Sequence, residues 1–286
     1  MRKLEILFIA PFVIVWSLFA VPPAADAMDC GQASAPAARA ICGDQQLQAA
    51  DAAMGEAYEK LLQAADDDAD IRAMLVDSQK RWLAERDKLF DRRLASADKD
   101  AQRAIMLSAI QDRTRVLTEP SGSPPQQPAL IVIAHGQRKF TARYTGGSFA
   151  GFDTSCEFLP VQDSYAYGCF ASRQYQNYSR VCTASRYWAT GRVHEKRSVA
   201  EISDDKARVI ATCSVDGAEG DTTCPGGSGE DRRWDTLPKA DAAAPMPSLP
   251  KIDAEAGPDE DAPWLRACLT DRSYPLSDPT SDGTRK

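Results

Sequence analysis

Residues 41–62, ICGDQQLQAADAAMGEAYEKLL, decide the fold of the first third of the chain. Apolar side chains recur there at three- and four-residue steps, which is typical of one face of an amphipathic helix. Asp44 stands just before the first of them, where a helix N-cap is expected. The stretch therefore predicts a helix whose apolar stripe consists of Leu47, Ala50, Met54, Tyr58, Leu61 and Leu62.

Two further helices are predicted after this one. Three consecutive aspartates at 66–68 predict a turn, and Asp70 is placed to cap a second helix, whose apolar stripe includes Trp82. A third helix is expected from Asp98 or Asp100 to residue 118. Because the connections are short, the three amphipathic helices predict a small antiparallel bundle.

The composition is that of a globular protein with room for two domains. The chain has 286 residues, of which 43% are hydrophobic and 26% are charged. Its 34 Lys and Arg stand against 41 Asp and Glu, a net charge of -7. This balance disfavours nucleic acid and anionic lipid as general partners and favours a cationic partner.

Residues 1–27 have the features of a cleaved signal peptide. A basic pair at residues 2–3 precedes an apolar segment at residues 6–21, and residues 25–27 (ADA) give a small-x-small cleavage pattern. The alternative, an uncleaved membrane anchor, would need roughly 20 apolar residues. This segment is shorter and contains Pro11. We therefore expect a periplasmic or secreted protein with no stable membrane anchor.

Eight cysteines follow that cleavage point, and an even number in an exported chain predicts disulfides. A zinc site would need closely spaced cysteines or clustered histidines. No two cysteines are closer than eleven positions, and the only histidines are His135 and His194, so we predict neither a metal nor another cofactor. The cysteines are Cys30, Cys42, Cys156, Cys169, Cys182, Cys213, Cys224 and Cys268.

Two of the pairings are predicted from position in the chain. Cys30 and Cys42 are near each other and far from Cys156, so they are expected to form their own bridge. Cys268 lies in a short apolar segment begun by Trp264, and we expect it to bridge back to the β domain with Trp264 packed beside it. The alternative is a free thiol or a disulfide-linked dimer. The remaining pairings stay open, because six cysteines allow fifteen of them.

Changes in composition divide the chain into segments and predict the fold class. We expect an α+β protein with two domains: a three-helix antiparallel bundle stapled by a disulfide, then a disulfide-rich antiparallel β domain. The segments are 1–27 (signal peptide), 28–118 (helical domain), 119–128 (Pro-rich linker), 129–237 (β domain), 238–263 (disordered Pro/Ala/acidic tether) and 264–286 (short docked helix and tail). The predicted strands are Leu130–Ala134, Lys139–Tyr144, Cys156–Val161, Tyr165–Ala171, Ser179–Thr183, Arg186–Ala189, Ser198–Ile202 and Ala207–Val215.

The helical segment carries a resemblance to a known family over residues 30–118. The matching positions, in order and spacing, are Cys30, Ile41, Cys42, Leu47, Asp51, Tyr58, Leu61, Gln79, Lys80, Arg81, Trp82, Leu83, Arg86, Asp87, Arg113 and Leu117. They resemble the N-terminal domain family of LprI-like lysozyme inhibitors, a helical, cysteine-stapled domain of exported bacterial proteins. The resemblance implies export, a small helical domain and inhibition of lysozyme. The chain departs from the family by having Phe90 where a second-bridge cysteine usually follows Arg-Asp.

Most of these motif positions are interpreted as structural. Trp82 falls on the apolar stripe, and the polar pair that follows one turn later more often fixes helix packing than contacts a partner. The residues interpreted in this way are Leu47, Asp51, Tyr58, Gln79, Trp82, Arg86, Asp87 and Arg113. The candidate partner-binding residues are instead the acidic ones Asp66, Asp67, Asp68 and Asp70, with a merely solvated turn as the alternative.

Binding rather than catalysis is the predicted activity. The chain has no G-x-S-x-G and no phosphate-binding loop, and His194-Glu195 lacks the second histidine of H-E-x-x-H. The leading hypothesis is an exported envelope protein that inhibits lysozyme or a related hydrolase by surface docking. The alternative is an envelope adaptor whose β domain, with arginines beside aromatics over residues 129–215, binds a glycan or a protein.

Overall fold

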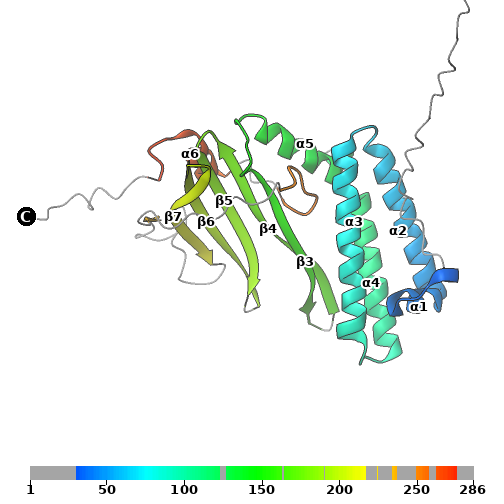
Figure 1. Cartoon of the computed structure of the whole chain (residues 1–286). Helices are drawn as coiled ribbons and strands as arrows, with labels where there is room; N and C mark the ends of the chain where they lie inside the picture. Colours follow the sequence, from blue (N-terminus) through cyan, green and yellow to red (C-terminus); the bar gives the residue numbers. More distant parts are fainter. Residues whose placement is uncertain are drawn as a thin grey trace, which may run out of the picture.

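The computed structural model places a helical bundle beside an antiparallel sheet (Figure 1). It describes residues 30–122, 127–162, 164–189, 191–216, 224, 234–236, 249–257 and 262–275. The predicted α+β class is confirmed, with helices first and the sheet after them. The predicted signal peptide lies outside the described residues.

The bundle begins with two short elements and continues with three long helices. The elements are η1 Cys30–Gln32, α1 Pro36–Cys42, α2 Gln45–Ala64, α3 Ala69–Leu89, the π-helical turn η2 Phe90–Leu94, and α4 Lys99–Thr118. Asp44 caps α2 as predicted, since its carboxylate accepts the N–H groups of Gln46 and Leu47 at 2.8 and 3.1 Å. Asp98 caps α4 in the same way, accepting from the N–H of Ala101 at 2.9 Å.

The cap of α3 corrects one detail of the sequence prediction. Asp68, not Asp70, is the N-cap, and its carboxylate accepts the N–H of Ile71 at 3.0 Å. The helix begins earlier than predicted because the turn before it is tighter: Asp66 adopts the left-handed region at φ 51°, which aspartate tolerates better than most residues. Asp70 therefore lies in the first turn of α3, where a carboxylate still favours the helix dipole.

A helix replaces the first two predicted strands of the β domain. Residues Ala129–Thr141 form α5, which contradicts the strands predicted at 130–134 and 139–144. The β-branched residues of this segment favour a strand, but its buried positions recur with a helical period; the first three of them pack on the bundle and the last one packs on the sheet. These positions are Leu130, Ile131, Ala134, Gln137 and Phe140.

The sheet is a meander in which each strand pairs with the next one along the chain. Its strands are β3 Gly151–Val161, β4 Ser164–Asn177, β5 Arg180–Ala189, β6 Arg192–Ser203, β7 Lys206–Asp216 and the two-residue β8 Asp235–Thr236. The six remaining strand predictions fall within these elements, except that Ser179 lies in the turn before β5. The predictions at 179–183 and 186–189 merge into the single strand β5, because its register with β6 runs unbroken from Arg180 to Ala189.

The predicted linker and the predicted tether both contain ordered residues where they are described. The ends of the Pro-rich linker pair with each other as β1 Pro120–Ser121 and β2 Gln127–Pro128. Residues 249–257, inside the predicted tether, pack between the sheet and the helices, so the prediction of a disordered tether is wrong for them (Figure 1). Phe152 donates its N–H to the carbonyl of Pro250 at 2.9 Å. Gly151 permits this approach, because a Cβ there would lie 2.4 Å from the Cβ of Leu249.

Four disulfides hold the described parts together. The predicted bridge Cys30–Cys42 is confirmed, and so is the return of Cys268 to the sheet, where it bonds to Cys182 in β5. The other bridges are Cys156–Cys169, across β3 and β4, and Cys213–Cys224. All eight cysteines are paired, so the alternative of a free or intermolecular Cys268 is not observed. Cys268 lies in α6 Pro263–Thr270, and Trp264 packs against Trp234 with ring centroids 6.1 Å apart.

The bundle and the β3–β4 hairpin share one hydrophobic cluster. Trp82 of α3 contacts Phe158 of β3 edge to face, with ring centroids 6.4 Å apart. Leu130 of α5 and Ile252 of the 249–257 segment belong to the same buried cluster as the bundle residues. Within the described ranges, no helix is long and apolar enough to cross a membrane.

Phe158→Ala should therefore destabilise both halves of the molecule. Large-to-small changes of a buried Phe cost about 3–5 kcal/mol, and this side chain joins the sheet to the bundle. In urea unfolding of the full chain, we expect fluorescence and far-ultraviolet circular dichroism to show one shared transition at a lower midpoint. Two separated transitions, with only one of them moved by the substitution, would contradict the shared core.

Candidate functional site

Buried polar side chains connect α3 and α4 through hydrogen bonds. Arg113 of α4 donates from Nε to Oε1 of Gln79 at 2.9 Å and from Nη2 to Oγ of Ser78 at 2.8 Å. All three residues are buried. Burial lowers the pKa of Arg113, while the nearby Glu255 carboxylate opposes that shift. A buried guanidinium is tolerated only when it is paired, so this arginine requires an anion.

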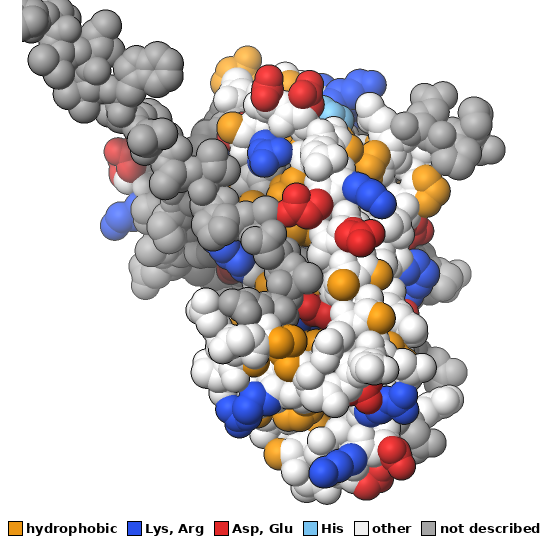
Figure 2. All heavy atoms as spheres, turned by 90° about the vertical axis from the view of Figure 1, so that its right-hand side faces the viewer, with side chains coloured by type: hydrophobic (Ala, Val, Ile, Leu, Met, Phe, Trp, Pro, Cys, Tyr) orange, Lys and Arg blue, Asp and Glu red, His pale blue; other side chains and the backbone are white. Residues whose placement is uncertain are grey.

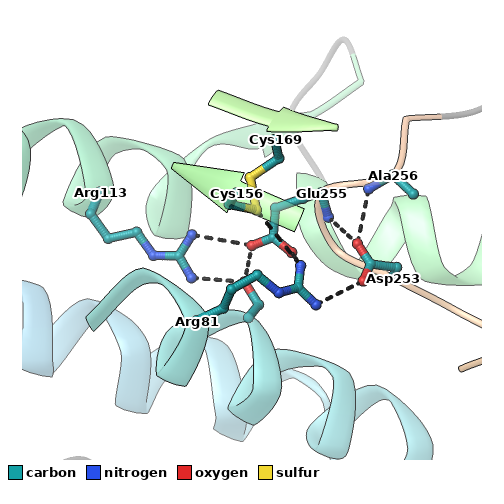
Figure 3. Close-up of a disulfide and its surroundings, with 8 residues drawn as sticks. Arg81, Arg113, Cys156, Cys169, Asp253, Glu255 and Ala256 are labelled. Atoms are coloured by element: carbon teal, nitrogen blue, oxygen red, sulfur yellow. Dashed lines mark hydrogen bonds and ion pairs between the residues drawn. A yellow bond between two sulfur atoms is a disulfide. The ribbon is translucent and has the colours of Figure 1, made fainter. Parts of the chain in front are cut away.

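The anion comes from the far end of the chain. Glu255 accepts the hydroxyl hydrogen bond of Ser78 and lies 3.6 Å from Nη1 of Arg113. Its other oxygen accepts from Nη1 of Arg81 at 2.7 Å, and Asp253 accepts from Nη2 of Arg81 at 3.0 Å. Figure 3 shows the two arginines converging on the two carboxylates beside the Cys156–Cys169 disulfide. Although burial opposes its charge, the hydrogen bond that Arg81 donates to the Asp253 carboxylate raises the pKa of Arg81.

Hydrogen bonds to the backbone also hold residues 253–256 in place. The side-chain amide of Gln137 in α5 donates to the carbonyls of Asp253 and Ala256 at 2.9 and 2.7 Å. Its oxygen accepts the N–H of Asp253 at 2.8 Å. The Asp253 carboxylate also accepts the N–H groups of Glu255 and Ala256, which fixes a local turn (Figure 3). The segment is therefore recognised through both its acidic side chains and its backbone.

A cleft of about 380 Å³ lies next to this ionic cluster. Its walls come from α3, α4, α5, the β3–β4 hairpin and residues 254–255. The hydroxyl of Tyr167 is buried there without a hydrogen-bond partner among the described residues, and burial, reinforced by the charge of Glu255, raises its pKa. Trp82 and Phe158 make one side of the cleft apolar, and Arg113 and Glu255 make the other side polar.

The remaining motif residues pack inside the bundle. Arg86 lies 3.5 Å from Oδ1 of Asp51 and 2.8 Å from Oδ1 of Asp87, with its guanidinium over the Trp82 ring at 5.7 Å. Of the eight motif residues, all except Asp87 are buried. This arrangement supports the structural interpretation of the motif, since buried side chains cannot meet a partner without unfolding.

The acidic turn is divided between internal and external roles. Arg138 of α5 donates to both oxygens of Asp68, at 2.7 Å to Oδ1, and to Oδ2 of Asp70 at 3.0 Å. The hydrogen bonds from Arg138 and then from the N–H of Ile71 hold the pKa of Asp68 well below its usual range. Asp66 and Asp67 are exposed, and no ion pair to either occurs in the described part of the chain.

Sequence reasoning found the aspartates of the turn but missed their partner and the ionic cluster. Gln137 and Arg138 lie between two segments predicted as strands, so the sequence prediction includes no contact of their side chains with the bundle. Asp253 and Glu255 lie in a segment predicted as disordered. The one signal present was the alternation of Ile252, Ala254 and Ala256 with the two acids, which is the pattern of an extended segment with one buried side.

Among the residues that the structure describes, no group of three or more His, Cys, Asp or Glu side chains is placed to hold a metal ion. The ionic cluster consists of paired groups that hold the chain's own segment. The arrangement is therefore suited to binding and to fixing a surface.

The fold defines the class as a disulfide-bonded α+β protein, which indicates an oxidising compartment. Residues 29–117 match the family model described as Lysozyme inhibitor LprI. The match covers α1 to α4 and confirms the resemblance for this N-terminal segment, while the sheet lies outside it. No curated protein and no solved structure matches the chain.

Removing the carboxylate of Glu255 should destabilise the protein strongly. In Glu255→Ala, Arg113 keeps its burial and loses its anion, and breaking a buried pair in this way costs about 3–5 kcal/mol. The free energy of unfolding in urea measures the loss. Glu157→Ala, an exposed glutamate on β3, is the control and should change stability by less than about 0.5 kcal/mol. Equal effects of the two substitutions would refute the role of the ionic cluster.

Asp68 should make the stability of the protein depend on acid pH. Because its folded-state pKa is depressed, it contributes stability above its unfolded value near 4, and this contribution fades as pH falls below that value. Asp68→Asn should lower stability at pH 7 and should lose part of the wild-type decline between about pH 5 and pH 2. Parallel stability–pH curves for the two proteins would show that the Arg138 contact contributes nothing.

Proposed function

We propose that this protein binds and inhibits a lysozyme-type hydrolase outside the cytosol, with the end of the bundle at the α2–α3 turn as its docking surface. The observation that carries the proposal is the match of residues 29–117 to the Lysozyme inhibitor LprI family. The name of that family supplies the partner class. The position of the docking surface is inferred from the distribution of acidic residues.

Negative charge runs along α2 and the first half of α3, and four of these acids, at positions 66, 67, 68 and 70, lie at the α2–α3 turn. Residues 44–77 contain nine Asp and Glu against two Lys and Arg, a net charge of -7 within a protein whose total is also -7. Figure 2 shows acidic side chains at the upper end of the outer bundle face, with basic ones beside them. An acidic surface attracts a basic enzyme such as lysozyme and accelerates their encounter.

At the turn itself, Asp66 and Asp67 are the exposed aspartates without an ion pair in the described part of the chain. We name this exposed pair the acidic tip. Asp68 and Asp70 face Arg138, and Asp51 faces Arg86, so their charges are already paired inside the molecule. Asp66 and Asp67 project from the turn between two helices that the shared core holds rigid, which limits the conformational entropy lost on docking.

The test is inhibition of lysozyme by the full mature chain, measured as the rate of clearing of a bacterial cell-wall suspension. Asp66→Asn with Asp67→Asn should weaken inhibition about tenfold, chiefly by slowing association. Asparagine also tolerates the positive φ of residue 66, so the turn is preserved. Added salt should weaken the wild type more than the variant, because the Debye length falls from about 30 Å at 0.01 M to about 8 Å at 0.15 M.

The matched control is Asp204→Asn with Asp205→Asn. These exposed aspartates also form a turn with positive φ, but they connect β6 to β7 in the sheet. Their replacement removes the same charge and should leave inhibition unchanged. Equal loss in both double variants would locate the effect in total charge. Absence of inhibition by the intact chain, across lysozymes of different charge, would reject inhibition and favour an envelope adaptor.

A further inference from the structure

The disulfides differ in how far solvent reaches them. The Cys182–Cys268 and Cys213–Cys224 bridges lie inside the core, with each of their cysteines 0% or 1% exposed. Both cysteines of the Cys156–Cys169 bridge are only partly buried. Because thiol–disulfide exchange requires a thiolate to reach a sulfur atom, this bridge is open to a reaction from which the two core bridges are protected.

The cleft beside the ionic cluster gives access to one half of this bridge. Cys169 lines the cleft of about 380 Å³, together with the apolar Trp82 and Phe158 and the charged Arg113. Sites for small molecules have volumes of about 300–1,000 Å³ and mix apolar walls with a few polar groups, as this cleft does. Cys169 is therefore the cysteine that a small molecule in the cleft approaches.

Cys156, the other half of the bridge, lies against a cation. Nη1 of Arg81 is 3.9 Å from Sγ of Cys156, and Figure 3 shows Cys156 on the side of the ionic cluster. A guanidinium beside a sulfur atom stabilises the thiolate form of that sulfur, which makes it the better leaving group in exchange. The two halves of the bridge thus have different roles: Cys169 is accessible to attack, and Cys156 is suited to leave.

The acids near Arg81 are balanced by a second cation. Asp253 and Glu255 both face the Arg81 guanidinium, and each already accepts a hydrogen bond from it, at 3.0 and 2.7 Å. Arg113 lies 3.6 Å from the other oxygen of Glu255. Two guanidiniums therefore offset the two carboxylates, and the charged group that contacts Sγ of Cys156 is a guanidinium.

The strand register keeps the two cysteines opposite each other when the bridge opens. Cys156 of β3 is paired directly with Cys169 of β4, and the pairing runs unbroken over residues 151–161, with five further pairs on each side. This ladder consists of backbone hydrogen bonds, which do not involve the sulfur atoms. Phe158 also holds the hairpin against Trp82. The bridge can therefore open and close again without unfolding of the hairpin.

We propose that the Cys156–Cys169 bridge is a thiol–disulfide exchange site for a low-molecular-weight thiol that enters the cleft. The thiolate of this molecule attacks Sγ of Cys169, the S–S bond breaks, and its electron pair leaves on Sγ of Cys156 as a thiolate beside Arg81. The product is a mixed disulfide on Cys169. Attack of a second small thiol on the mixed disulfide releases Cys169 as a thiolate and the small thiol as its own disulfide, and both protein thiolates take up protons from water. Attack by Cys156 instead restores the bridge.

The experiment follows every bridge of the folded, full mature chain in excess reduced glutathione. Samples are quenched with N-ethylmaleimide, and peptide mapping by mass spectrometry locates both labels. Glutathione should be found on Cys169 and N-ethylmaleimide on Cys156 of the same molecule. The core bridges Cys182–Cys268 and Cys213–Cys224 should open at least about a hundredfold more slowly, because they are reached only through unfolding. Glutathione on Cys156, or a common rate for this bridge and the core bridges, would overturn the proposal.

Arg81→Gln tests the role of the cation. Its loss should slow the opening of the Cys156–Cys169 bridge about tenfold, whereas Arg81→Lys keeps a positive charge and should keep the rate within about threefold of the wild type. A purely structural effect has the opposite sign, because loosening of the fold exposes the bridges and speeds their opening. The Cys30–Cys42 bridge, in which Cys30 is exposed, is the control, and its rate should be equal in all three proteins. An unchanged or faster rate at Cys156–Cys169 in Arg81→Gln contradicts the proposal.

Discussion

The burial of the Arg113 guanidinium is the constraint on which the rest of the architecture depends. This charge lies inside the bundle, where Ser78 and Gln79 satisfy its hydrogen bonds but leave it without an anion. Glu255 supplies the carboxylate. A helical unit that resembles a separate family domain is thus electrostatically incomplete on its own, and the sheet with its C-terminal segment is part of its fold.

Helix α5 connects this constraint to the surface. Gln137 on one side of the helix holds residues 253–256, while its neighbour Arg138 binds the two carboxylates at the start of α3. The same short helix therefore holds residues 253–256 in place and neutralises Asp68 and Asp70, two of the four aspartates at the turn. The exposed charge of the acidic tip is what is left after internal pairing.

Sequence patterns predicted what is determined locally. The caps of α2 and α4 depend on a few neighbouring residues. The Cys30–Cys42 bridge and the return of Cys268 to the sheet follow from the number and positions of the cysteines. Parts of α5 are predicted as strands because strand propensity and helical periodicity disagree in this segment, and tertiary packing selects the helix. The order of residues 249–257 could not be predicted, since their hydrogen-bond and ionic partners lie far away in the sequence. At the candidate sites, the charged residues were recognisable, whereas their pairing with Arg138 was not.

The Cys182–Cys268 bridge determines whether the chain stays in one covalent piece when its backbone is cut. It spans 86 positions and encloses both the Cys213–Cys224 bridge and the seated residues 249–257. A protease that cuts once anywhere between positions 182 and 268 yields two polypeptides that stay covalently joined. Such a nicked molecule retains one mass without reductant, and the anion required by Arg113 remains tethered within reach.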